Sequence, residues 1–362
     1  MAVKIVKGNV LPIGIDLGST SLKLAQLSET QSVYDLVAAG SAELPPECQD
    51  NFNVRLHFCE KAIRDIVRIN GFRGRQAVLS VPADATFVHH VKVPKRPPDQ
   101  IHQTLLGELA GKLPFPASEA EIRHVVAGDI PGNDQPRLEV IVVAVPRATV
   151  QAQLAMARRA KLDVVGINVE SCAIVDCFGR VLRRASDQNR PVLFIDLGHA
   201  STQVVLSHGR QIVFARNVSV AGRTLDAAVA EALGIPPAEA HQIRRQLDAE
   251  DPADPRVSEL YMCMSQAIDQ LIDELSQCLL YYEAVFRSQS IERVIFLGGQ
   301  AMNRRLCQTI AQRLNLPAQI GDPLVRIGAS NALSPDCGLD RREPQPRWAV
   351  AIGLSLGGAQ AA

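Results

Sequence analysis

The sequence predicts a mixed α/β protein with two lobes. The chain has 362 residues, more than twice the ~150 residues of a typical domain. Short apolar stretches typical of strands alternate with longer amphipathic stretches typical of helices in both halves. One motif also occurs twice, as Ile-Asp-Leu-Gly-Ser-Thr-Ser at residues 15–21 and as Ile-Asp-Leu-Gly-His-Ala-Ser at residues 195–201. We therefore expect each lobe to contain one copy of an ancestral hairpin.

Composition excludes several classes of protein. Hydrophobic residues make up 47% and charged residues 21%, which argues against disordered, collagenous and coiled-coil chains. The 38 basic residues balance the 38 acidic ones, so we expect no nucleic-acid partner. Eight cysteines without a C-x-x-C pair predict reduced thiols and no structural zinc. The longest uncharged run, residues 348–362, is shorter than the ~20 residues of a spanning helix, so we expect a cytoplasmic protein without direct membrane insertion.

The first lobe is predicted to have a core interrupted by a long insertion. Residues 8–85 form the first part of this core, and residues 163–190, with the hinge helix, form its second part. The polar stretch 183–190 is the predicted boundary between the lobes. Between them, residues 86–162 show a β-α-β-β-α pattern typical of a compact subdomain. The predicted strands are 11–17, 22–27, 77–81, 86–93, 121–127, 138–145 and 164–169, and the predicted helices are 50–69, 99–113, 147–161 and 170–182.

The second lobe is predicted in three parts. Residues 191–224 form a core with the second hairpin, residues 225–290 a helical subdomain, and residues 291–362 the rest of the core. The predicted strands are 192–197, 201–207, 211–218 and 293–297, and the predicted helices are 223–233, 238–246, 258–287 and 302–315. Residues 348–356 close the chain with no element assigned.

The repeated turns are candidates for binding phosphate. A short turn of Gly, Ser and Thr lets successive backbone N–H groups converge on an anion. A carboxylate at the end of the preceding strand can hold Mg²⁺ through water. Either turn alone could be an ordinary β-hairpin whose glycine only shapes the backbone. The pair, each with Asp before Leu-Gly, favours a phosphate clamp.

A third motif follows at residues 294–301, where a strand ends in Gly298 and Gly299 before a helix. Glycines at this position permit close approach of a flat ligand such as a purine. The same pattern is also typical of a tight turn between a strand and a helix.

These three motifs, in this order, resemble those of the actin, Hsp70 and sugar-kinase superfamily. Within it the chain resembles the PilM family of ATP-binding proteins of type IV pilus assembly over nearly its whole length. The resemblance implies a two-lobed actin-like ATPase fold of duplicated RNase H-like domains, with an FtsA/PilM-type inserted subdomain in the first lobe. The short segments that resemble this family are residues 93–94, 112–115, 139–146, 281–283 and 348–354.

The resemblance implies ATP and Mg²⁺ as ligands and assigns residues to each. Asp16 and Asp196 would flank the magnesium ion and the phosphates, while His241 and Arg244 would grip the nucleoside from a helix of the second lobe. Lys23 would add charge near the phosphates, although it could instead be an exposed strand lysine. The remaining assigned residues are the turn donors Gly18, Ser19, Thr20, Ser21, Gly198, His199, Ala200, Ser201 and Thr202, and the adenosine motif Gly298, Gly299 and Gln300. His199 could alternatively point to solvent.

Catalysis is the weakest implication of the resemblance. Glu170 matches the residue that orients water, but could equally be a carboxylate stabilised by a helix N-terminus. His241 and Arg244 stand where the family has Glu and Lys, and Asn168 stands where an Asp is expected. Whether ATP is hydrolysed is left open, and at most slow hydrolysis is expected.

The function expected from the resemblance is an ATP-binding scaffold of a pilus or related secretion machine. Its partner would be the cytoplasmic N-terminal peptide of an inner-membrane PilN-like protein, which would hold the chain peripherally at that membrane. The inserted subdomain would be the docking surface. Other assembly proteins are further expected partners, and self-association is left open. The alternatives are a small-molecule kinase of the same superfamily and an FtsA-like filament-forming protein.

Overall fold

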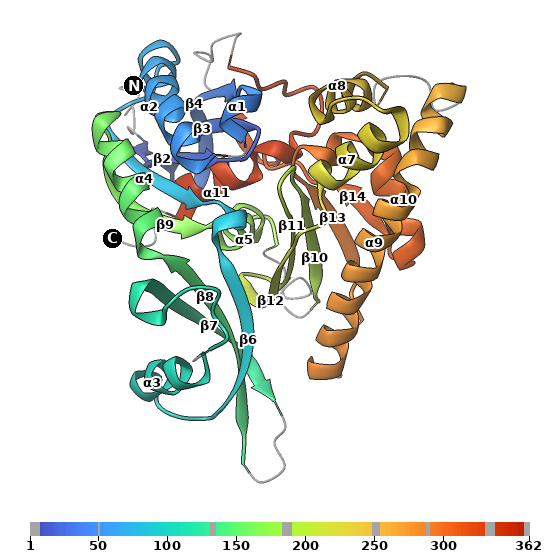
Figure 1. Cartoon of the computed structure of the whole chain (residues 1–362). Helices are drawn as coiled ribbons and strands as arrows, with labels where there is room; N and C mark the ends of the chain where they lie inside the picture. Colours follow the sequence, from blue (N-terminus) through green and yellow to red (C-terminus); the bar gives the residue numbers. More distant parts are fainter. Residues whose placement is uncertain are drawn as a thin grey trace, which may run out of the picture. The chain divides into compact units, whose positions relative to one another are not determined.

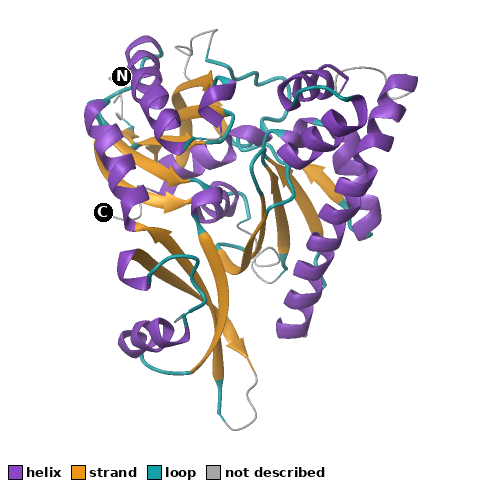
Figure 2. Ribbon diagram, in the orientation of Figure 1, coloured by secondary structure: helices purple, strands orange, loops and turns teal. Residues whose placement is uncertain are grey.

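The chain divides into two units, of which unit 1 contains one β-sheet and unit 2 contains two (Figures 1 and 2). Unit 1 comprises Met1–Pro82, Ala148–Leu182 and Gly321–Ala362, and unit 2 comprises Ala83–Arg147 and Arg183–Ile320. The mixed α/β class predicted from the sequence is confirmed. This computed structural model describes residues 8–49, 51–109, 111–130, 135–182, 190–247, 254–286, 290–329 and 337–357. The predicted boundary between the lobes at 183–190 lies outside these ranges except for its last residue.

The sheet of unit 1 has the strand order β15-β4-β3-β2-β5-β9, with β1 paired to β3. Strands β2, β3 and β4 are antiparallel to one another, whereas β5 and β9 continue the sheet in parallel. Parallel neighbours require long crossover connections, which here contain helices. The strands are β1 (Asn9–Val10), β2 (Ile13–Leu17), β3 (Ser21–Thr30), β4 (Val33–Glu43), β5 (Gln76–Val81), β9 (Asp163–Val169) and β15 (Ile327–Ala329).

Two helices, α2 (Phe52–Ile69) and α4 (Arg147–Arg159), pack on one face of this sheet. They share a core with Ile13, Ile15 and Leu17, which alternate along β2 and therefore point to the same side. Asn51 caps the N-terminus of α2, because its side chain accepts hydrogen bonds from two backbone N–H groups of the first turn. The short helix α1 (Pro46–Gln49) precedes it.

The opposite face of β2 carries Gly14, which lies against the C-terminal helix α11 (Ala349–Gly357). A Cβ atom on Gly14 would overlap the carbonyl oxygen of Ala351. In the same way, a Cβ atom on Gly353 would overlap the carbonyl oxygen of Ala173 in helix α5 (Glu170–Gly179). The two glycines let α11 approach both a strand and a helix at backbone distance. α11 is accordingly buried from Ala349 to Leu356.

The sheet of unit 2 repeats the arrangement of unit 1, with the order β12-β11-β10-β13-β14. Its first three strands in the chain are again antiparallel, and two more again join in parallel. The duplication inferred from the repeated motif is therefore present in the fold itself. The strands are β10 (Val192–Leu197), β11 (Thr202–His208), β12 (Gln211–Val218), β13 (Arg293–Leu297) and β14 (Ala318–Ile320).

Four helices pack against this sheet around one apolar core. The longest, α9, buries Met264, Ile268, Leu271 and Leu275, which recur at the three- and four-residue spacing of one helix face. Gly234 follows the last residue of α7, and its φ of 65° is the left-handed conformation usual after a helix. The helices are α7 (Gly222–Leu233), α8 (Pro237–Leu247), α9 (Pro255–Phe286) and α10 (Arg304–Leu314).

A three-stranded antiparallel sheet with the order β6-β8-β7 also belongs to unit 2. It packs with helix α3 around its own core, which includes Val91 and Val93. Glu139, fully buried on β8, accepts hydrogen bonds from Tyr281 Oη at 2.7 Å and His90 Nδ1 at 2.8 Å, which links this sheet to α9. The elements are β6 (Phe87–Pro94), α3 (Pro98–Glu108), β7 (Ala120–Ile130) and β8 (Arg137–Pro146).

The structure divides the chain differently from the boundaries expected from the sequence. Helix α4 was placed in the inserted subdomain, yet its Met156 and Ala157 lie in the core of unit 1. Residues 321–357 were placed in the second lobe, yet α11 packs on β2. Strand β4 was not predicted, and α3 ends at Glu108, before the expected Leu113.

The eight cysteines, all within the described ranges, are free thiols. None of the helices in the described part of the chain has the length and apolarity to span a bilayer.

Candidate functional site

The two repeated turns share one backbone geometry. In unit 1, Asp16 pairs with Lys23 across the hairpin, and in unit 2 Asp196 pairs with Gln203 at the same offset. A Cβ atom on Gly18 would lie 2.7 Å from the carbonyl oxygen of Ser21, and one on Gly198 would lie 2.6 Å from that of Ser201. Each turn therefore requires its glycine for the same reason, which is close approach across the loop.

In the first turn a carboxylate and an ammonium group are both withdrawn from solvent. Asp16 and Lys23 are each 7% exposed, and Lys23 Nζ lies 3.7 Å from Asp16 Oδ2. Lys23 also donates a hydrogen bond to Ser21 Oγ at 2.6 Å. Burial raises the pKa of Asp16 above its ordinary value, and the charge of Lys23 opposes this rise. The alternative of an exposed strand lysine is therefore wrong.

In the second turn the carboxylate of Asp196 lies beside the third motif. Gly298 has a φ of 85°, and a Cβ atom there would overlap Asp196 Oδ1 and the backbone of Leu197. No heavy atom lies near the corresponding position on Gly299. The strand-to-helix turn of the third motif and the second repeated turn thus meet within unit 2.

The backbone of the second turn is also attached to the start of α7. The carbonyl oxygen of Gly198 accepts a hydrogen bond from Gly222 N at 3.1 Å, and that of His199 accepts one from Arg223 N at 2.8 Å. Thr202 is fully buried, and its hydroxyl donates to the carbonyl oxygen of Val220 at 2.8 Å. The Thr202 hydroxyl therefore already has a hydrogen-bond acceptor within the protein.

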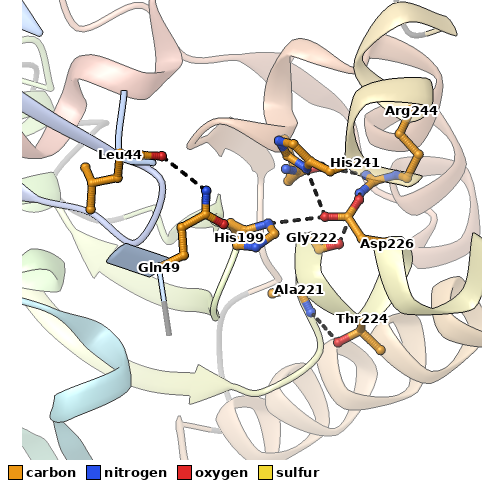
Figure 3. Close-up of polar contacts among 10 residues, drawn as sticks. Leu44, Gln49, His199, Ala221, Gly222, Thr224, Asp226, His241 and Arg244 are labelled. Carbon is orange, nitrogen blue, oxygen red and sulfur yellow. Dashed lines mark hydrogen bonds and ion pairs between the residues drawn. The ribbon is translucent and has the colours of Figure 1, made fainter. Parts of the chain in front are cut away.

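A cluster of polar side chains centres on Asp226 of α7 (Figure 3). The Arg244 guanidinium, only 2% exposed, bonds to Asp226 Oδ1, to the carbonyl oxygen of Gly222 at 3.0 Å and to Gln300 Oε1 at 2.6 Å. His241 Nδ1 lies 2.9 Å from Asp226 Oδ2. The pair expected to grip a nucleoside is thus bonded to a carboxylate of the protein.

His199 also turns toward this cluster. Its side chain is 12% exposed, and its Nδ1 lies 3.4 Å from Asp226 Oδ2. The alternative in which His199 points to solvent is therefore wrong. Burial lowers the pKa of His199 to about 4. Burial alone would raise the pKa of Asp226, but hydrogen bonding to His241 and the charge of Arg244 outweigh it and hold that pKa below its ordinary value.

Asp226 was missed by the sequence analysis, although a signal for it exists. It falls on the buried stripe of α7, with Leu225, Val229 and Ala230. A carboxylate on the apolar stripe of a helix requires partners within the fold. Such a position is a cue for a polar site.

The remaining predicted residues belong to α5, β9 and the two repeated turns. Glu170 is the first residue of α5 in unit 1, where it is half-buried. Asn168 accepts a hydrogen bond from Val169 N at 2.9 Å through its side chain. Ser19, Thr20, Ala200 and Ser201 are half-buried turn residues. In unit 1 the structure brings together Asp16, Ser21 and Lys23. In unit 2 it brings together His199, His241, Arg244 and Gln300.

The duplicated sheets with matching hairpin turns define an actin-like ATPase fold, and comparison with known proteins agrees. The chain matches the family described as type IV pilus assembly protein PilM over residues 14–359, and it belongs to this family.

Two solved structures show the same fold. A PilM-PilN type IV pilus biogenesis complex contains a chain that is 22% identical, with a TM-score of 0.79. The match covers 96% of this chain and 98% of that one. The ethanolamine utilization protein EutJ from Carboxydothermus hydrogenoformans is 14% identical, with a TM-score of 0.57 and coverage of 98% and 92%.

Proposed function

We propose that the chain is an ATP-binding scaffold of type IV pilus assembly, whose nucleotide state is coupled to binding of an inner-membrane partner. The observation that carries the nucleotide part is the repeated turn. Both copies place an aspartate at the same register and require a glycine at the same point. Backbone N–H groups of such turns suit phosphate, and the two carboxylates suit Mg²⁺ through water.

The donor set fits phosphate and magnesium better than it fits a nucleoside. Gly18–Ser21 and His199–Ser201 would supply N–H groups, whereas Gly198 N already donates to the carbonyl oxygen of Ser201. Asp16 and Asp196 would flank the metal. His241 and Arg244 are engaged by Asp226, so the nucleoside part of the proposal rests on Gly298, Gly299 and the neighbouring backbone. Bound Mg-ATP would supply the negative charge that the N–H groups of such turns bind.

Calorimetry with Asp16→Ala/Asp196→Ala tests this proposal. The double variant should lose the dependence of ATP binding on Mg²⁺, because the carboxylates that hold the ion are gone. Asp269→Ala is the matched control, since it removes a carboxylate that is 55% exposed on α9. Mg²⁺-dependent binding that survives unchanged in the double variant would rule out the clamp.

For the partner, we propose the cytoplasmic N-terminal peptide of an inner-membrane PilN-like protein. Support comes from membership of the PilM family and from the likeness to a chain of a PilM-PilN complex. Through this peptide the chain would lie on the cytoplasmic side of the inner membrane. ATP would then act as a structural ligand that sets the affinity for the peptide.

The proposed docking surface is the β6-β8-β7 sheet with α3. Val91 and Val93 of β6 are buried in the core of this sheet, so they cannot contact a peptide. β6 and β7 are instead the edge strands, and the edge of a sheet can add a peptide as a further strand.

Photo-crosslinking locates the peptide without disturbing the fold. A crosslinking side chain replaces Leu106, which is 40% exposed on α3, or Lys112, which is exposed beyond it. The comparison positions are Met262 and Leu280 on α9, which are 68% and 65% exposed. Crosslinks at the first pair support docking on the inserted sheet. Crosslinks confined to α9 would move the partner site to that helix.

A further inference from the structure

Three side chains with metal-binding atoms converge in unit 2. His199 follows β10, Asp226 lies on α7 and His241 lies on α8 (Figure 3). One potential ligand atom from each residue lies within 4.8 Å of the other two. The three residues are far apart in the sequence, so no short sequence motif predicts that they form a metal site.

The spacing of these atoms suits a tetrahedral metal ion. Metal–nitrogen bonds of about 2.0–2.1 Å and metal–oxygen bonds of about 2.0–2.2 Å place neighbouring ligand atoms roughly 3.3–3.5 Å apart. Asp226 Oδ2 lies 3.4 Å from His199 Nδ1 and 2.9 Å from His241 Nδ1. The three ligand atoms lie within 4.8 Å of one another, so coordination requires the two imidazole nitrogens to approach each other by up to about 1.5 Å.

The surroundings leave these atoms available. His199 Nδ1 is buried and makes no hydrogen bond. Asp226 uses one carboxylate oxygen for Arg244 and directs the other toward the two imidazoles. A hydrogen bond of this kind from an outer residue orients a ligating carboxylate in many metal sites. Arg244 thus fixes the orientation of the Asp226 carboxylate, and the second carboxylate oxygen, Oδ2, faces the two imidazoles.

We propose that His199, Asp226 and His241 bind a divalent transition metal ion of the Zn²⁺ type. Two imidazoles and one carboxylate favour Zn²⁺, Co²⁺ or Fe²⁺, whereas Mg²⁺ prefers oxygen ligands alone. Three protein ligands leave a fourth position for water or another ligand. The site is distinct from the Mg²⁺ site proposed at Asp16 and Asp196, and its occupancy requires no ATP.

The test is Zn²⁺ and Co²⁺ binding by the full chain, purified without a histidine tag and stripped of metal. One equivalent of Zn²⁺ should bind per chain without nucleotide. His199→Ser and His241→Gln should each weaken binding more than about 100-fold, since loss of an outer-shell residue alone costs 10–100-fold. Both variants keep the pair of Asp226 and Arg244, so they should remain folded, which circular dichroism checks.

Co²⁺ spectra distinguish this site from the free cysteines. Bound Co²⁺ should show visible absorption without the near-ultraviolet thiolate band. His208→Gln is the control, because it removes another half-buried histidine of unit 2, and it should bind normally. Asp16→Ala should also keep Zn²⁺ binding even if it abolishes the magnesium dependence of ATP binding. Absence of Zn²⁺ binding, a thiolate band, or unchanged affinity in both histidine variants would overturn the proposal.

Discussion

Replacing Glu139 by alanine should loosen the inserted sheet from the rest of unit 2. Glu139 is fully buried and joins three elements through two hydrogen bonds. His90, one of its partners, also contacts the carbonyl oxygen of Ala215 on β12 through Nε2 at 3.1 Å. Burial, together with the hydrogen bond to Glu139, raises the pKa of Tyr281, so its hydroxyl remains a donor at neutral pH.

The structure sets the size of the expected effect. Glu139→Ala removes the acceptor of two hydrogen bonds and leaves the polar atoms of His90 and Tyr281 without it. A buried hydrogen-bonding group left without its partner costs about 1–3 kcal/mol, so the two groups together should cost about 2–6 kcal/mol. Tyr281→Phe removes only one of the two bonds and should cost about 1.5–3 kcal/mol.

Thermal unfolding and hydrogen exchange measure this loss. For a unit of this size, a loss of about 2–6 kcal/mol in Glu139→Ala should lower the Tm by roughly 4–24 °C. Hydrogen exchange of the backbone amides should accelerate first in β6, β8 and β12, which the hydrogen bonds of Glu139 and His90 connect. A free energy of unfolding within about 1 kcal/mol of the unmodified chain, with unchanged exchange in these strands, would refute the reasoning.

Three further predictions follow from the glycines and from the residues that depart from the family pattern. Gly298→Ala should destabilise the chain by about 1–3 kcal/mol, since its φ is 85° and the new Cβ would overlap Asp196, whereas Gly299→Ala should be near neutral in the same denaturation experiment. Gly14→Ala should cost at least about 1–3 kcal/mol by pushing α11 from β2, while Gly166→Ala, whose Cβ would meet Val78 at 3.6 Å, should be tolerated. ATP turnover should lie well below the ~1–10³ s⁻¹ of typical enzymes, and a steady-state rate of tens per second that Glu170→Ala abolishes would contradict this expectation.

Much of the fold could be predicted because the repeated motif marks equivalent positions in both sheets. The elements with strong periodicity, such as α2 and α9, were predicted within a few residues of their bounds. Strand β4 was missed because its buried stretch, residues 36–40, is Leu-Val-Ala-Ala-Gly, and alanine and glycine are depleted in strands. Its neighbours in the sheet, which only the tertiary structure supplies, decide its conformation.

The C-terminal helix and the cluster around Asp226 show two further limits. α11 is buried all round from Ala349 to Leu356, so it has no polar face from which a helical period could be read. Asp16 and Asp196 could be identified from the repeated motif. Asp226 could not, because its partners His199 and Arg244 come from other elements. Local patterns identify turns, whereas side-chain partnerships across a fold depend on packing.

Binding of ATP, ADP and adenosine, each with and without Mg²⁺, tests the central claim most directly. If the two turns clamp phosphate, calorimetry should show Mg-ATP binding more tightly than Mg-ADP, and both far more tightly than adenosine. Removal of Mg²⁺ should weaken ATP binding and leave adenosine unaffected. Adenosine binding as tightly as Mg-ATP, or no nucleotide binding at all, would contradict the claim that these turns form a phosphate site.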